Sequence, residues 1–159
     1  MVIEDDSRIQ CVYYSMSEEN LRKKISLPWV SFCSDAGSYS DIDKDFRTHP
    51  RAFGSFIRVI GKFSRDEGVL TLEEAIRKLS GFPAKTLELD RRGTIENENF
   101  ADIVIFDPKK VRDLATFNEP HQFAEGVEIV LVNGQVVLES GEHTGIFPGR
   151  FVKGIGKDL

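Results

Sequence analysis

One acidic side chain draws attention because of its position in the sequence. The apolar run Trp29-Val30-Ser31-Phe32-Cys33 predicts a buried strand, and the turn residues Ser34-Asp35-Ala36-Gly37 end it. Asp35 would then lie one or two residues past the carboxyl end of that strand, where active-site residues collect in βα barrels and open α/β sheets. The alternative is that Asp35 only caps a turn, with Gly37 supplying the sharp bend.

The tripeptide His49-Pro50-Arg51 closes the polar loop 38–48 that follows. A long loop at the carboxyl end of a strand suggests a binding lid. The loop lacks the glycine and the terminal glutamate of a calcium-binding loop, so we interpret its alternating aspartates as solvated charges. They are Asp41, Asp43 and Asp45.

The composition of the 159 residues, 40% hydrophobic and 30% charged, is typical of a soluble globular protein. A formal net charge of -5 argues against a nucleic-acid or anionic-membrane surface. The sequence shows neither a membrane-length apolar stretch nor a secretory signal pattern at its start, so the cytoplasm is the expected location. Cys11 and Cys33 fall in apolar runs, which predicts buried, reduced thiols.

The elements that must position Asp35 begin with a strand at Ile9–Ser15, rich in β-forming residues. Ser17 is a plausible N-cap for a helix that Pro28 ends, and the strand at Trp29 follows. Strand, helix and strand make one βαβ unit with parallel pairing.

Two amphipathic helices are predicted next. Pro50 fits the first turn of one, whose apolar stripe ends at Gly68, and Thr71 with Glu74 forms a capping box that opens the other. Gly81 closes that helix as a C′ glycine, and Pro83 starts a short further helix. The stripe consists of Phe53, Phe56, Ile57, Ile60 and Phe63.

The last third of the sequence has a β pattern. Turn residues surround a short strand within 91–99, a strand at 102–106 follows, and strands at 127–132 and 135–138 flank Asn133-Gly134, a strong hairpin signal. We place the boundary near residue 85 and predict two domains, 1–85 (α/β) and 86–159 (β). Neither set of elements completes a fold by itself, so we expect a fragment of a larger fold, or a chain whose exposed apolar faces favour a homo-oligomer.

Several segments resemble the C-terminal part of N-acyl-D-amino-acid deacylases (D-aminoacylases), in the amidohydrolase superfamily of metal-dependent hydrolases. Ala101-Asp102-Ile103-Val104 and Val132-Asn133-Gly134 are common to many amidohydrolases, whereas Ser34-Asp35 followed by His49-Pro50-Arg51 is narrower and indicates the D-aminoacylase branch. The other matching segments are Tyr14-Ser15-Met16-Ser17-Glu18, 72–81, 105–108, Thr116-Phe117, Pro120-His121 and Pro148-Gly149-Arg150.

The resemblance implies a (β/α)8 barrel with a small β-sandwich, in which Ile9–Ser15 is barrel strand seven and the Trp29 run is strand eight. It implies zinc-assisted hydrolysis of an N-acyl-D-amino acid, with Asp35 as a metal ligand and as the catalytic base, then acid. Arg51 matches the arginine that pairs with the α-carboxylate of the substrate, and the alternative is a surface charge at a helix start. His49 is a further substrate-binding candidate, although a histidine before proline can simply shape the loop.

Two departures from the family pattern matter. Ala36 stands where the family usually has glycine, and the remaining metal ligands, a cysteine and several histidines of earlier strands, have no counterpart here. Cys11 and Cys33 do not match the ligand cysteine, and His121 and His143 receive no metal role. One carboxylate does not hold a catalytic zinc, so the isolated chain is expected to be inactive.

Two other interpretations remain open at this stage. One is a non-catalytic interaction or assembly module derived from an amidohydrolase. The other is a dihydroorotase-like or dihydropyrimidinase-like enzyme, which shares the Ala-Asp-Ile-Val and Val-Asn-Gly segments but not His-Pro-Arg. The preferred D-amino acid and acyl group are not readable from the sequence.

Overall fold

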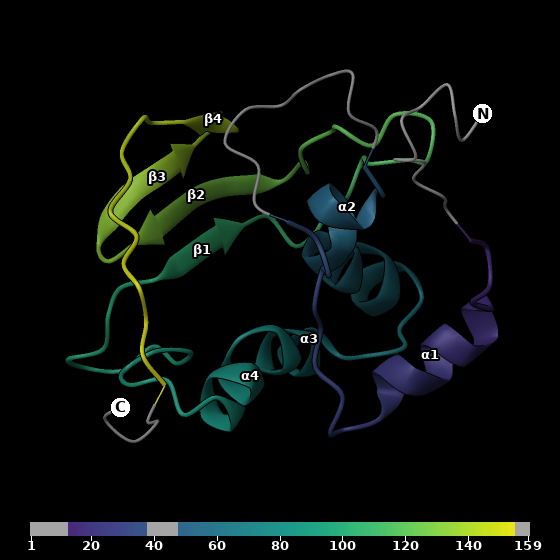
Figure 1. The fold of residues 1–159 in the computed structure, drawn as a ribbon, viewed down its shortest axis with the longest axis horizontal. Helices are drawn as coiled ribbons and strands as arrows, with labels where there is room; N and C mark the ends of the chain where they lie inside the picture. The colour runs from purple at the N-terminus through teal and green to yellow at the C-terminus, as the bar shows by residue number, and fades with distance from the viewer. Residues whose placement is uncertain (1–12, 38–47, 155–159) are drawn as a thin grey trace, which may run out of the picture.

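The structure, a computed structural model, describes residues 13–37 and 48–154. Helices gather on one side and a small sheet on the other (Figure 1). The helices are α1 (Glu18–Ser26), α2 (Arg51–Arg58), the π-helix η1 (Val59–Asp66), α3 (Leu72–Leu79) and α4 (Gly81–Thr86). The strands are β1 (Ile103–Phe106), β2 (Val127–Val132), β3 (Gln135–Glu139) and β4 (Glu142–His143).

Two helices begin at the residues that the sequence predicts. The Ser17 hydroxyl accepts a hydrogen bond from the Asn20 N–H (3.1 Å) at the start of α1, and the Thr71 hydroxyl accepts one from the Glu74 N–H (3.2 Å) at the start of α3. Such caps satisfy N–H groups that have no partner inside the helix. Both N-cap predictions are confirmed.

The core lies where η1 and α3 meet. Val59, Leu70 and Ala75 form a buried cluster, and Phe32 and Leu79 pack against it. The predicted apolar stripe is buried at Ile60 and Phe63 in the same helical run. The stripe predicts a helix but not its π form, because apolar spacing does not specify i→i+5 hydrogen bonds.

The sheet has the order β1-β2-β3-β4, with every neighbouring pair antiparallel. Val132 pairs with Gln135 across a two-residue turn, in which Asn133 has φ 48° and Gly134 has φ 78°. Type I′ turns need positive φ at both central residues, so the predicted Asn-Gly hairpin is confirmed.

Several strands predicted for the first half do not form in the described residues. Trp29–Cys33 forms no strand, and neither does Tyr13–Ser15; residues 9–12 lie outside the described part. A strand needs a neighbour for its N–H and C=O groups, and within the described ranges neither segment has a ladder partner. The parallel βαβ pairing is therefore not seen.

Three local expectations also need correction. Gly81 is the first residue of α4 and not a C′ glycine; α3 ends at Leu79 with Ser80 (φ −128°) as its C-cap, and the second helix follows at once. No strand forms within 91–99, where bends and turns occupy the chain. Cys33 is a free thiol, as expected, but it is exposed, since the strand that would have buried it does not form.

The loop between β1 and β2 connects the sheet side to the helices. Asp113 accepts hydrogen bonds from the Arg58 side chain (2.7 and 2.9 Å), and the Val111 carbonyl accepts one from Arg65 (2.5 Å). Gly61 approaches the same carbonyl so closely that a Cβ there would lie 2.7 Å from its oxygen. These contacts fix the loop against α2 and η1, beside the candidate site.

Candidate functional site

Asp35 and Arg51 meet directly, although sixteen positions separate them. The Arg51 guanidinium lies 2.8 Å from the Asp35 carboxylate and donates a second hydrogen bond to the Asp35 carbonyl (3.0 Å). Arg51 is the first residue of α2, which fixes the direction from which it approaches. The structure therefore brings together the candidate acid and the candidate carboxylate receptor that the sequence singled out.

The backbone at Asp35 adopts the left-handed conformation, with φ 49°. Aspartate tolerates this region better than most residues, so the chain turns at Asp35 itself, and alanine at position 36 does not prevent the turn. The Asp35 N–H donates to the Cys33 sulfur (3.3 Å). The Asp35 side chain is 82% exposed and that of Arg51 is 45% exposed, so the pair faces open space.

His49 is attached to the same helix start. Its Nδ1 accepts a hydrogen bond from the Arg51 N–H (3.1 Å), which places the proton of the neutral ring on Nε2. Desolvation by burial, and next the charge of Arg51, lower the pKa of His49. The ring is therefore a neutral donor near neutral pH.

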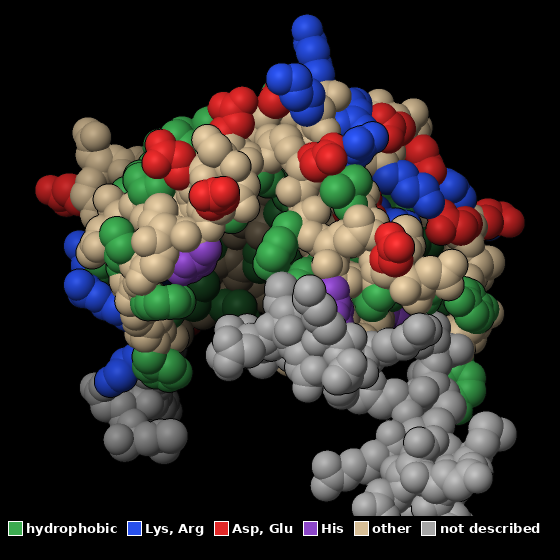
Figure 2. Space-filling view, turned by 90° about the horizontal axis from the view of Figure 1, so that it is seen from above, with side chains coloured by type: hydrophobic (Ala, Val, Ile, Leu, Met, Phe, Trp, Pro, Cys, Tyr) green, Lys and Arg blue, Asp and Glu red, His purple; other side chains and the backbone are tan. Residues whose placement is uncertain are grey.

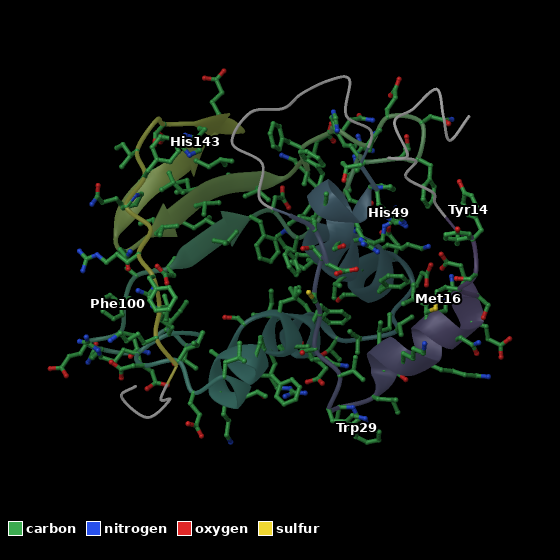
Figure 3. All side chains as sticks on the ribbon, viewed as in Figure 1. Tyr14, Met16, Trp29, His49, Phe100 and His143 are labelled. Atoms are coloured by element: carbon green, nitrogen blue, oxygen red, sulfur yellow. The ribbon has the colours of Figure 1, made fainter. Side chains whose placement is uncertain are left out.

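Aromatic side chains flank His49. Phe117, from the β1–β2 loop, contacts the His49 ring edge-on (5.0 Å between centroids) and the Tyr14 ring at 4.9 Å. Tyr14 and His49 lie on the same side of the molecule (Figure 3). In the sequence, Phe117 belongs to the Thr-Phe segment that resembles the deacylases. Its contact with His49 was not predicted, because no local pattern shows that this loop returns to α2.

A second aromatic group follows along α2. The Phe53 ring lies 5.5 Å from that of His121 and 5.7 Å from that of Phe123. His121 therefore packs in an aromatic cluster. The His121 side chain thus has an ordinary packing role. Both His121 and Phe123 come from the β1–β2 loop.

The two superfamily-wide motifs have structural roles. Asp102 accepts the Asn133 N–H (2.8 Å) and pairs with Arg92, which also donates to the Asn133 side chain (2.8 Å). The side-chain NH₂ group of Asn133 donates a hydrogen bond to the Pro148 carbonyl (2.7 Å). These bonds tie β1, the hairpin turn and the irregular tail together.

The described residues do not fit a catalytic zinc by themselves. Within 13–37 and 48–154, no group of three or more His, Cys, Asp or Glu side chains could hold a metal ion. Catalytic zinc takes three protein ligands, and the Asp35 carboxylate is paired with Arg51. His143 contacts Phe147 in the sheet part, and its ring lies on the opposite side of Figure 3 from that of His49.

Two surface features bear on function. In the ranges that the structure covers, no helix combines the length and apolarity needed to span a bilayer. Acidic and basic side chains are interspersed over the face shown in Figure 2, where no broad basic patch gathers.

Comparisons with known proteins show which family the chain resembles. The sequence profile of the "Amidohydrolase family" matches residues 30–138. D-aminoacylase of Alcaligenes xylosoxydans xylosoxydans is 37% identical over 139 residues, which are 87% of this chain and 28% of that protein. The crystal structure of a D-aminoacylase, described as defining a novel subset of amidohydrolases, matches with a TM-score of 0.82 and 37% identity, over 89% of this chain and 29% of that one.

The N-acyl-D-glutamate deacylase from Bordetella bronchiseptica is a further structural relative, with a TM-score of 0.73 and 35% identity over 82% of this chain and 26% of that one. It was solved with zinc and a phosphonate that mimics the tetrahedral intermediate of its reaction. The chain thus spans less than a third of the length of these relatives. It has part of their fold, including a small antiparallel sheet, and it belongs to the amidohydrolase family.

Proposed function

We propose that this chain is the C-terminal part of a longer zinc-dependent enzyme, here called the complete deacylase, that hydrolyses N-acyl-D-amino acids to a D-amino acid and a carboxylate. The observation that carries the proposal is the direct pairing of Asp35 with Arg51. It puts a proton-transfer group within 3 Å of a group that recognises carboxylates. The names of the relatives support the reaction class.

Asp35 is the proposed catalytic residue. As a carboxylate it takes a proton from the attacking water, and as an acid it returns one to the leaving amine. Its exposure leaves room for water and substrate. We further propose that Asp35 contributes to a zinc site whose other ligands belong to residues outside the described part.

Arg51 is the proposed receptor for the α-carboxylate of the substrate. Its guanidinium has several N–H donors, so it can keep the Asp35 contact while another edge meets a carboxylate. Holding the carboxylate at a fixed point beside Asp35 would select one configuration at the α-carbon. His49, a neutral donor on the same turn, would contact the substrate through Nε2.

The finer fold assignment is part of this proposal. Ile9–Ser15 and the Trp29 run would become barrel strands seven and eight when the preceding strands supply backbone partners. The sheet would form part of a small β-sandwich, with the division at 1–85 and 86–159. Exposed aromatic side chains such as Tyr13 (82%) and Phe151 (88%) support contact with further protein surface.

The test is an assay of the complete deacylase with zinc, against matched N-acetyl-D- and N-acetyl-L-amino acids. We expect turnover of the D series only, lost on chelation and restored by zinc. Turnover of the L series alone would contradict the assignment. Absence of both turnover and bound zinc would favour a non-catalytic module.

The 159-residue chain serves as the matched control. Since its described residues assemble no metal cage, we expect neither turnover nor stoichiometric zinc. We also expect self-association through its apolar surfaces, measured by light scattering. Turnover by this chain alone would refute the proposal that it needs the remaining residues.

A further inference from the structure

Lys78, on α3, is fully buried, with 0% of its surface exposed. Its ammonium donates hydrogen bonds to the carbonyls of Ile25 and Leu27 (2.7 Å for Leu27). Ile25 lies in the last turn of α1, and Leu27 is the C-cap of that helix. The lysine therefore satisfies carbonyls at the end of a helix that is distant in sequence.

Burial of a lysine ammonium is costly, and desolvation lowers the pKa of Lys78. No carboxylate forms an ion pair with it in the described ranges, and its partners are backbone carbonyls and the Phe32 ring, 5.6 Å away. An apolar side chain would fill this space without the desolvation cost. Unlike an apolar side chain, the ammonium donates hydrogen bonds, and these bonds connect α3 to two particular backbone carbonyls.

Arg77, the neighbour of Lys78, extends this connection. It donates to the Pro28 carbonyl (2.8 Å), and Glu74 orients it with two bonds of 2.6 and 2.7 Å. Phe32, four residues further along, packs against the core cluster. Side chains of α3 therefore contact the chain at several points between Ile25 and Phe32, and Phe32 lies three residues before Asp35.

Resting on the proposed function, we propose that Lys78 is a positioning residue for Asp35. It fixes the segment 25–32, and this segment determines where the Asp35 carboxylate meets Arg51. The segment forms no strand pairing in the described residues, so side chains of α3 replace the ladder that would otherwise define its path. Among the described residues, Asp35 itself contacts Arg51 and donates its N–H to the Cys33 sulfur.

The test compares variants of the complete deacylase. In Lys78→Met, a side chain of similar length fills the space without donors, and in Lys78→Arg the donors remain. Arg77→Met removes the bond to Pro28, together with the two bonds to Glu74 and the guanidinium contact with the Phe82 ring, at an exposed position outside the core. Lys85→Met makes the same chemical change on the exposed surface of α4, and Val111→Ala lowers stability at a fully buried position beside Gly61.

Two readouts separate positioning from stability. For Lys78→Met we expect kcat to fall about 10- to 100-fold with KM little changed, because an error of about 1 Å in the placement of a catalytic group costs that much. Peptide-resolved hydrogen exchange should be faster across 29–37 in the same variant. Arg77→Met should show both effects more weakly, Lys78→Arg should restore most of kcat, and the two controls should show neither.

The outcomes are distinct. Wild-type enzyme without turnover overturns the proposed function, and this role of Lys78 falls with it. Active wild type with unchanged kcat in Lys78→Met, or unchanged exchange across 29–37, overturns the role of Lys78 alone. If Lys78→Met does not fold, normal kcat and normal exchange in Arg77→Met overturn it, and Val111→Ala reproducing the kcat loss also does so.

Discussion

The sheet and the approach to Asp35 are held in different ways. In the sheet, each strand pairs with the next strand in sequence, so backbone hydrogen bonds fix its path. The chain from α1 to Asp35 has no such pairing in the described ranges, and side chains of α3 about fifty residues later hold its carbonyls. Local pattern therefore predicts β1, β2, β3 and the hairpin between β2 and β3, whereas the path of the segment that carries Asp35 depends on distant side chains.

The largest expected effect is the loss of turnover on substitution of Asp35. Asp35→Asn in the complete deacylase should reduce kcat by about 10²- to 10⁴-fold, the usual contribution of a positioned proton-transfer group. The fold should persist, because Asp35 is exposed and asparagine tolerates positive φ. Steady-state kinetics and circular dichroism would check this, and near-normal turnover would refute the assigned base.

The next largest effect is a loss of stability at Gly126, the residue before β2. Gly126 has φ 79°, and a Cβ there would lie 2.5 Å from the Val111 nitrogen. Gly126→Ala should therefore destabilise by about 2–4 kcal/mol, since backbone strain and overpacking add. Gly68 (φ 62°) has nothing within 4 Å, so Gly68→Ala should cost only the strain, about 1–2 kcal/mol. Equal costs in denaturant unfolding would show that the close approach to Val111 is wrong.

Arg51→Lys tests the carboxylate receptor. It should raise KM about tenfold for substrates with a free α-carboxylate, because an ammonium does not reproduce the two-point contact of a guanidinium. Esterified analogues, which lack the anionic partner, provide the matched comparison. An equal loss for both substrate types would count against carboxylate pairing.

Helix caps offer a smaller and local test. Thr71→Ala should cost about 1 kcal/mol of stability, through loss of the hydrogen bond from the Glu74 N–H. Thr71→Ser is the control, since it keeps the hydroxyl. Thermal unfolding compares the two, and a cost that serine does not restore would exclude the cap as its cause.

The smallest effect is the pH response of His49. Its pKa is lowered in the folded state, so the unfolded chain binds the proton more readily. Stability should fall as the pH drops from 7.5 through 6.5 toward the folded-state pKa, and level off below it. His49→Gln does not titrate, so the wild type should lose stability relative to this variant on acidification, and a gain would reverse the sign of the assigned pKa shift.

The sequence predicts what neighbouring residues determine. Ser17 and Thr71 cap helices through side chains that reach three residues ahead, and Asn133-Gly134 encodes its own turn. The Trp29 run fails because a strand depends on partners that a local pattern does not reveal. Phe117 beside His49 and Lys78 beneath α1 were missed for the same reason, since both contacts join distant segments.

In the candidate site, too, the residues were predicted but their contact was not. The resemblance to deacylases selected Asp35, His49 and Arg51, and the structure places the three side by side. Their roles in catalysis remain proposals. The pairing of Asp35 with Arg51 was not predicted, because a sixteen-residue separation carries no local signal.

The most direct test of the account is a crystal structure of the complete deacylase with zinc and a non-hydrolysable N-acyl-D-amino acid analogue. We predict that the α-carboxylate of the ligand contacts Arg51, and that the Asp35 carboxylate lies within hydrogen-bonding distance of the atom that replaces the attacking water. A ligand carboxylate bound away from Arg51, with Asp35 remote from the reacting centre, would contradict the account.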